Sequence, residues 1–438
     1  MAVLLQYLCI KLGVASQMDL AQSCRKMLPP RVNILFYILC ELAIIACDLA
    51  EVVGTAIALN LLFGMPMWLG VLVTALDVLL ILAGWSTKHI RIFELFIFFL
   101  FSGIGICFSV LIYETSPDWS QVLRGYIPTM RLFTDKDVLY VAMGIIGATV
   151  MPHNLYLHSS IVKSRSFRGG QLGEIHENQE EIEDERSYLD ANADENASIV
   201  DLDKTPLLPN QGHWTSDMIN EAIRMSNFDS VSALTMALLI NSSILIVAGT
   251  AFHNVKEDVG DLSEAYKLLV KSFGSLAGYA FAIALLFSGQ SSTITGTLAG
   301  QICMQGFLGS QFRIAPWIRR LTTRSLAIIP AMIVAIYKGN DGVNDLLVFS
   351  QVVLSLQLPF AIWPLIVYTS SRAFMTVTFV NYPSTSTLEE CESSLETIDE
   401  DLFVQSDFSN SWLLTIIAYI IGILITLFNV VLLIQILF

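Results

Sequence analysis

The chain has 438 residues, of which 54% are hydrophobic and only 14% are charged, and its mean hydropathy is +0.63. A chain of this length is too apolar to fold as one or two soluble domains. The formal net charge of −15 is concentrated, because residues 174–203 hold twelve Asp and Glu and residues 389–401 hold seven more. We predict an all-α, polytopic membrane protein with two acidic loops.

Ten apolar segments predict membrane helices. A helix needs about twenty residues to cross the hydrocarbon core. The first segment is shorter, begins at Met1 and carries no cationic leader, so it is neither a convincing signal peptide nor a complete span. We therefore expect that the start of the chain is cut. The ten segments are residues 1–14, 34–63, 68–84, 91–113, 138–162, 231–252, 276–303, 324–338, 345–370 and 412–437.

Segment 34–63 carries three carboxylates, Glu41, Asp48 and Glu51, in an otherwise apolar stretch. Their spacings of seven and three residues place them near one face of a helix. Ionisable groups inside a span are rare and usually lie on an ion or proton path. The segment therefore predicts a proton or cation relay. The alternative is that the carboxylates pair with basic residues at the membrane rim or on another helix.

The most distinctive run lies within segment 138–162, where residues 147–158 read Gly-Ala-Thr-Val-Met-Pro-His-Asn-Leu-Tyr-Leu-His. Pro152 has no backbone N–H, so it frees carbonyl groups one turn earlier, around Ala148. Such a break is tolerated at membrane depth only inside protein or beside water. The Ala148 carbonyl and the Met151 thioether would converge on the unwound turn. A thioether discriminates against Ca²⁺ and Mg²⁺ and tolerates Mn²⁺ and Fe²⁺.

Two histidines follow this break. His153 and His158 are five residues apart, about 140° around an α-helix, so we do not expect them to chelate one ion together. Because imidazole changes its charge near neutral pH, we expect both on a proton path below the metal site. The alternative for the whole run is an ordinary proline kink, with Met151 filling the core and each histidine hydrogen-bonded to a neighbouring helix.

Two polar regions, 164–226 and 376–410, are rich in Glu, Asp, Ser and Asn, and they cannot bury enough surface to offset the cost of ordering the chain. We expect both to be disordered. Sixteen Lys and Arg fall on the side of the membrane that holds these loops, against seven on the other, which makes the loops cytosolic. The predicted organisation is membrane helices over residues 1–163, 227–375 and 411–438, separated by the two loops.

Two later segments are polar where lipid-facing residues would not be. Residues 289–301 include Gly296 and Gly300, a spacing typical of close helix packing. Segment 345–370 carries Gln351 and Gln357, and either could contact a substrate or join two helices. The seven cysteines are scattered, so neither a disulfide framework nor a thiolate metal site is indicated. Phosphate-binding, esterase and metalloprotease motifs are absent, and we expect no enzyme, no cofactor and no nucleic-acid partner.

Four ordered motifs resemble the natural resistance-associated macrophage protein (Nramp) family of proton-coupled divalent metal transporters. The motifs are residues 48–56, 151–159, 289–308 and 350–360. The resemblance implies a LeuT-like fold of two inverted five-helix repeats, with a site at the membrane midplane where helices are unwound. It implies transport of Mn²⁺ and Fe²⁺ with protons, in the plasma membrane or a vacuolar or endosomal membrane.

The resemblance also assigns roles to individual residues of this chain. The metal would be held by Ala148, Met151 and, in some states, Gln351. Residues of the proton path would be Asp48, Glu51, His153 and His158, with Glu41 and Arg324 as a charged pair near its exit.

The sequence departs from the family in one respect. Family members begin with a helix that carries an Asp-Pro-Gly-Asn motif, and that string is not found in this sequence. We therefore expect a LeuT-like fold truncated at the N-terminus, with four helices in the first repeat. Either the sequence is an incomplete version of a transporter, or it is a paralogue or regulatory membrane protein that does not transport. A solute symporter on the same scaffold is a third reading, which Met151 disfavours.

Overall fold

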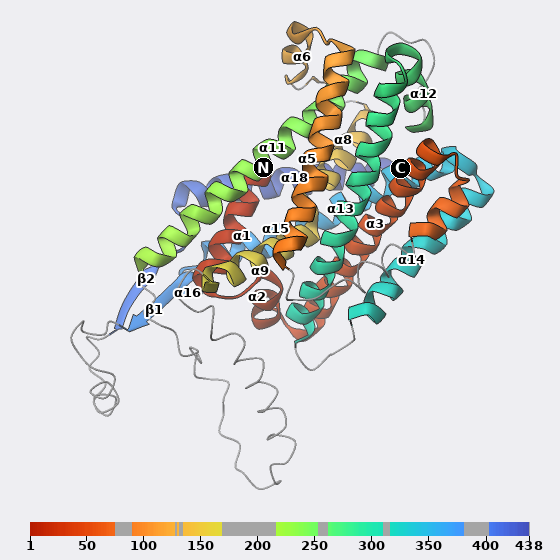
Figure 1. The fold of residues 1–438 in the computed structure, drawn as a ribbon. Helices are drawn as coiled ribbons and strands as arrows, with labels where there is room; N and C mark the ends of the chain where they lie inside the picture. The colour runs from red at the N-terminus through yellow and green to blue at the C-terminus, as the bar shows by residue number, and fades with distance from the viewer. Residues whose placement is uncertain are drawn as a thin grey trace.

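A computed structural model describes residues 1–74, 90–127, 129–130, 135–168, 216–252, 262–309, 316–380 and 403–437 (Figure 1). Long helices run side by side through the molecule, and short helices cap their ends. Before the broken span the described helices are α1 (Ala2–Ser16), α2 (Leu20–Met27), α3 (Pro30–Phe63), α5 (Ile90–Thr115) and α6 (Trp119–Gly125). The broken span comprises α8 (Lys136–Thr149) and α9 (Pro152–Arg168). The later helices are α11 (Ser216–Phe252), α12 (Leu262–Phe273), α13 (Ser275–Leu308), α14 (Pro316–Tyr337), α15 (Gly339–Ser370), α16 (Arg372–Met375) and α18 (Trp412–Leu437).

Within the described ranges, seven helical stretches are long and apolar enough to cross a membrane. They are Pro30–Phe63, Phe98–Thr115, Lys136–Ser164, Ser216–Ala251, Ile318–Tyr337, Gly342–Ser370 and Trp412–Gln435. The segment predicted at 1–14 forms α1, a shorter apolar helix, and the segment predicted at 276–303 lies inside α13. Part of the segment predicted at 68–84 falls on residues 75–89, outside the described ranges.

Helix α3 forms the centre of the site. Pro30 stands at its first turn, where a missing N–H costs nothing, and Gly64 ends it in the left-handed conformation. Helices α13, α14 and α15 all pack along α3. The middle of the helix, from Ala43 to Ala58, is almost entirely buried. Among the described residues, the buried carboxylates on α3 therefore lie beside groups from these neighbouring helices.

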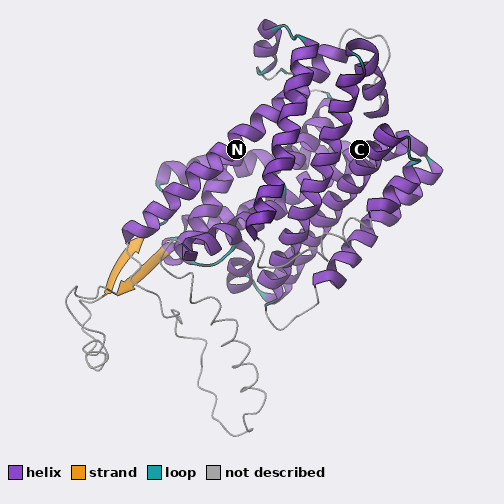
Figure 2. Ribbon diagram, in the orientation of Figure 1, coloured by secondary structure: helices purple, strands orange, loops and turns teal. Residues whose placement is uncertain are grey.

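The membrane helices are accompanied by one small sheet, which the all-α prediction did not include (Figure 2). Strands β1 (Thr376–Val380) and β2 (Phe403–Asp407) pair antiparallel, with Thr376 opposite Asp407 and Val380 opposite Phe403. The disorder predicted for 376–410 is therefore wrong at both ends. Alternating apolar residues such as Val377 and Val404 favour this pairing, although the acidic composition of the segment hides the pattern.

The boundaries predicted for the first acidic loop also differ from the structure. Helix α9 continues to Arg168 and α11 begins at Ser216, whereas the loop was expected to cover 164–226. The reason is amphipathic spacing, because Ile219 and Ile223, four residues apart, are both buried on one face of α11. The rest of the predicted loop, residues 169–215, lies outside the described residues.

Candidate metal and proton site

The predicted break in segment 138–162 is confirmed. Helix α8 ends at Thr149, Val150 takes a non-helical conformation (φ −118°, ψ 82°), and α9 begins at Pro152. In a continuous helix the Ala148 carbonyl would accept a hydrogen bond from the backbone N–H of residue 152, and proline has none. The carbonyl of Ala148, an exposed residue, is thus available to a ligand at the end of α8.

Met151 lies between the two halves of the broken span and is half-buried. Its Sδ atom is 3.7 Å from Sγ of Cys47 on α3. The Cys47 sulfur is in turn 3.5 Å from Oε1 of Glu51 and 3.9 Å from Oγ of Ser292 on α13. Two sulfur atoms and a carboxylate therefore meet beside the break. Cys47 carries no signal of this contact in the sequence, because nothing in the order of residues relates α3 to residue 151.

Gln351 on α15 lies next to the end of α8. Gly147 is essential to this approach, because a Cβ at that position would overlap the backbone oxygen of Gln351. The Gln351 amide nitrogen donates to Oγ of Ser350 at 3.2 Å. Its buried Oε1 has no hydrogen-bond partner in the part of the chain that the structure describes. A buried, unpaired amide oxygen beside the break is an acceptor available to a cation.

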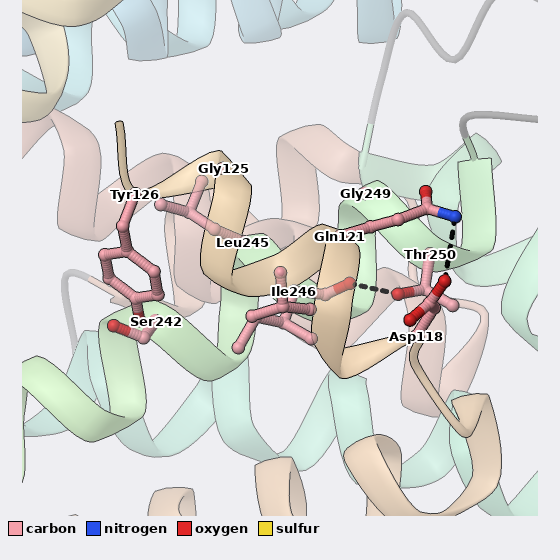
Figure 3. Close-up of a pocket in the computed structure, with 10 residues that line it drawn as sticks. Asp118, Gln121, Gly125, Tyr126, Ser242, Leu245, Ile246, Gly249 and Thr250 are labelled. Carbon is pink, nitrogen blue, oxygen red and sulfur yellow. Dashed lines mark hydrogen bonds between the residues drawn. The ribbon is translucent and has the colours of Figure 1, made fainter. Parts of the chain in front are cut away.

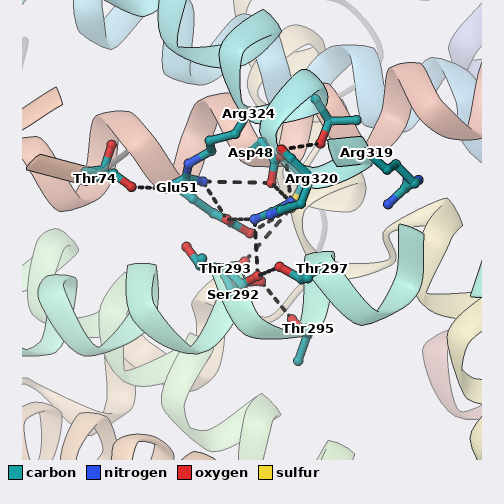
Figure 4. Close-up of polar contacts among 12 residues, drawn as sticks. Asp48, Glu51, Thr74, Ser292, Thr293, Thr295, Thr297, Arg319, Arg320 and Arg324 are labelled. Atoms are coloured by element: carbon teal, nitrogen blue, oxygen red, sulfur yellow. Dashed lines mark hydrogen bonds and ion pairs between the residues drawn. The ribbon is translucent and has the colours of Figure 1, made fainter. Parts of the chain in front are cut away.

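The carboxylates of α3 meet arginines of α14 in the interior of the protein, as Figure 4 shows. Nη1 of Arg320 donates to both oxygens of Asp48, at 2.7 and 2.9 Å. Nη1 of Arg324 donates to Oε2 of Glu51 at 3.2 Å, and all four side chains are at most 3% exposed. This carboxylate–arginine cluster (Asp48, Glu51, Arg320 and Arg324) holds two negative and two positive charges. Mutual pairing offsets the cost of burying them.

The prediction that Glu41 pairs with Arg324 is wrong. Glu41 pairs instead with Arg319, whose Nη2 lies 2.7 Å from Oε2 of Glu41. The reason is helical phase: Arg324 follows Arg320 by four residues and shares its face, whereas Arg319 is rotated by about 100°. The sixteen Lys and Arg counted on the cytosolic side included Arg319, Arg320 and Arg324. These three arginines are buried inside α14, so they are not loop charges.

Gly296 and Gly300 make room for these charged groups. A Cβ at position 296 would lie 3.5 Å from Oε1 of Glu51, and one at position 300 would overlap the guanidinium of Arg319. The spacing that predicted close packing of helix backbones therefore leaves space for buried side chains. The structure shows the alternative arrangement, in which the carboxylates of α3 pair with basic residues on another helix.

The two histidines lie in different surroundings. His153 is 1% exposed, within electrostatic range of Asp48 and Arg320, and its Nδ1 lacks a hydrogen-bond partner among the described residues. Nε2 of His158 lies 3.1 Å from Oγ of Ser230 on α11, which also donates to Gln6 on α1. The structure brings His153, but not His158, to the carboxylate–arginine cluster.

A separate cavity of about 650 Å³ lies between α6 and α11 (Figure 3). Polar and apolar residues share its wall, among them Gln121 of α6, the residues Asp118 and Tyr126 that flank α6, and Ser242 and Leu245 of α11. None of the residues that line this cavity belongs to the predicted site. It therefore adds nothing to the metal or proton assignments.

The chain is similar to known proteins. Residues 1–388 match the family described as "Natural resistance-associated macrophage protein-like". The chain belongs to this family. The match covers the broken span, the α3 carboxylates and the arginines of α14, and members of the family are transporters and not enzymes.

Individual relatives agree with the family assignment. The chain is 46% identical over 377 residues to the divalent metal cation transporter MntH of Nostoc sp., covering 86% of this chain and 74% of the relative. It is 44% identical over 385 residues to MntH of Listeria innocua, covering 87% and 75%. A crystal structure of the Eremococcus coleocola manganese transporter superposes with a TM-score of 0.69 at 32% identity, covering 98% of this chain and 77% of that one. The Nramp fold is LeuT-like, as the sequence motifs implied.

Proposed function

We propose that this chain is a proton-coupled carrier of divalent transition metal ions, with Mn²⁺ and Fe²⁺ as substrates. The observation that carries the proposal is the break at Val150–Met151, where a thioether and a free carbonyl stand beside buried, paired carboxylates. Relatives named divalent metal cation transporters support the same substrate class. As a multi-pass membrane protein, the chain would act in the plasma membrane or in a vacuolar or endosomal membrane.

The metal is held by three groups in this proposal. The Ala148 carbonyl and the Gln351 amide oxygen supply oxygen donors, and Met151 supplies a soft sulfur. Hard ions prefer an all-oxygen shell, so the thioether lowers the affinity for Ca²⁺ and Mg²⁺ relative to Mn²⁺ and Fe²⁺. Met151 therefore sets selectivity more than total affinity.

Protons follow a neighbouring path in this proposal. His153 carries an imidazole that can bind or release a proton, and it lies within electrostatic range of Asp48, whose charge Arg320 already balances. Glu51 with Arg324 and Glu41 with Arg319 continue the buried polar groups along α3 and α14. His158 is placed on the α11 side of the path, where Ser230 contacts its ring. A proton on this path and a metal ion beside it are carried together when both sites change their exposure from one side of the membrane to the other, which couples the two fluxes.

Met151→Ala tests the metal assignment. Cells starved of metal that express this variant should keep part of their Mn²⁺ uptake and should take up Ca²⁺ several-fold better, because oxygen donors then dominate the site. Met236→Ala, an exposed position on α11, is the matched control and should behave as the parent. If Met151→Ala excludes Ca²⁺ as well as the parent protein does, Met151 is not a ligand of the transported metal. Absence of divalent metal binding by the purified parent protein would overturn the proposed function itself.

A further inference from the structure

We propose that Cys47 is a specificity-determining residue, whose sulfur forms with the Met151 thioether a two-sulfur face that favours Zn²⁺ and Cd²⁺ over Mn²⁺. The inference deepens the proposed function and rests on it, because it takes Met151 to be a metal ligand. It concerns a residue for which the sequence indicated no metal role.

The spacing of the two sulfurs fits one shared ion. Zinc–sulfur bonds are about 2.3 Å long, so two sulfur ligands at tetrahedral angles on one zinc ion are about 3.8 Å apart. Sγ of Cys47 and Sδ of Met151 are separated by 3.7 Å. The two atoms come from α3 and from the break before α9, so an ion held between them would join the two elements.

Cys47 has polar as well as apolar neighbours. Its sulfur lies 3.5 Å from the Glu51 carboxylate and 3.9 Å from the Ser292 hydroxyl. A buried cysteine more often packs as a small apolar residue. Here Ala43, Ala46 and Leu354 pack in one cluster with Cys47 and Met151, and the carboxylate and hydroxyl oxygens are additional neighbours of the Cys47 sulfur.

Unsatisfied acceptors nearby point to a ligand. Oε1 of Gln351 is buried without a hydrogen-bond partner among the described residues, and so is Nδ1 of His153, a side chain only 1% exposed. Buried polar atoms without partners are uncommon in native proteins, and an unseen ion is one of the explanations for them. The Gln351 oxygen of α15 thus accompanies the two sulfurs as a donor, and the unpaired nitrogen of His153 marks a second polar group without a partner on α9.

The chemistry distinguishes soft ions from Mn²⁺. Thiolate and thioether ligands select soft ions, whereas Mn²⁺ prefers carboxylate, carbonyl and water oxygens. When Zn²⁺ or Cd²⁺ binds, the metal–sulfur bond replaces the S–H bond of Cys47, and the proton passes to water. No electrons are transferred, so the step needs no oxidant or reductant.

Binding to the purified full chain tests the inference. Cd²⁺ and Mn²⁺ affinities are measured for the parent, Cys47→Ser, Cys47→Ala and the control Cys107→Ser, whose thiol lies on α5. The parent should show an ultraviolet sulfur-to-cadmium charge-transfer band, which both Cys47 variants lose and Cys107→Ser retains. Cys47→Ser should also lower Cd²⁺ affinity about tenfold more than it lowers Mn²⁺ affinity.

Each outcome decides between the proposals. A charge-transfer band and Cd²⁺ affinity that survive in both Cys47 variants, with Mn²⁺ binding still sensitive to Met151→Ala, overturn the role of Cys47 and leave the proposed function intact. Failure of the parent to bind either ion overturns both. If size-exclusion chromatography shows that Cys47→Ser does not fold, Cys47→Ala supplies the same comparison. The charge-transfer band is also measured on the parent protein after its accessible thiols have been alkylated. Loss of the band would assign it to an accessible cysteine and overturn the role of buried Cys47.

Discussion

At the scale of single residues, the site depends on charges that are buried in pairs. Arg320 and Asp48 are both fully buried, whereas Arg372, which contacts Asp407 at 3.3 Å, is 85% exposed. A buried pair contributes little net stability, but removing one partner leaves an uncompensated charge in a medium of low dielectric constant. The same chemical contact therefore has different consequences at the two places.

Arg320→Gln should destabilise the protein by about 3–5 kcal/mol, because Asp48 then loses its nearest partner and keeps only the longer contact with Arg324, at 3.8 Å. Arg372→Gln, the matched control, should cost less than about 1 kcal/mol, because water solvates both exposed groups. Thermal unfolding of the purified variants in one detergent compares them. Equal shifts of the unfolding temperature would show that Asp48 finds another partner.

His153→Gln should flatten the rise of Mn²⁺ uptake at acidic pH while Mn²⁺ binding changes little, since the change removes a titratable group beside Asp48 and leaves the metal ligands in place. His158→Gln is the comparison, because His158 contacts Ser230 and lies outside the carboxylate–arginine cluster. It should alter the pH profile less. Overlapping pH profiles of the parent and His153→Gln would remove His153 from the proton path.

At the scale of helices, the position of the break depends on close contact with a neighbour. Helix α8 can lie against α15 because Gly147 has no side chain where the Gln351 backbone passes. Proline sets where the chain breaks, and glycine sets how near the broken end comes to α15. The two residues act on different parts of the same site.

Gly147→Ala should reduce Mn²⁺ uptake strongly, because the new methyl group overlaps backbone atoms of α15 and displaces Gln351 from the break. Gly249→Ala on α11 is the matched control, since no atom lies within 4 Å of the added Cβ. Alanine there should raise helix stability by up to about 1 kcal/mol and leave uptake unchanged. Both variants are compared by uptake and by thermal unfolding. Full uptake in Gly147→Ala would show that α15 adjusts without loss.

At the scale of the whole molecule, polar contacts join elements that are far apart in the sequence. Nζ of Lys11 on α1 donates to the carbonyl of Ser409 at 2.8 Å and to Oδ1 of Asn410 at 3.0 Å. The Asn410 amide donates to Oγ1 of Thr369 on α15 at 2.9 Å. One asparagine thus connects α1, α15 and the segment that leads into α18.

Asn410→Ala should destabilise the protein by about 1–3 kcal/mol, because buried Lys11 and Thr369 both lose a partner. Asn241→Ala, at an exposed position on α11, is the control and should lower stability by less than about 0.5 kcal/mol. The unfolding temperatures of the two variants, measured in the same detergent, give the comparison. A stability loss no larger than that of the control would mean that the Lys11 contacts do not join these elements.

The sequence by itself determined the membrane class, most helices and the break before Pro152, because hydrophobic runs and a missing N–H act locally along the chain. It also placed Glu41, Asp48 and Glu51 on one helix. Their partners depended on the tertiary structure, because the phase of α14 against α3 decides that Arg319 meets Glu41 and Arg324 meets Glu51. The contact between Cys47 and Met151, 104 residues apart, likewise requires α3 and the broken span to pack together.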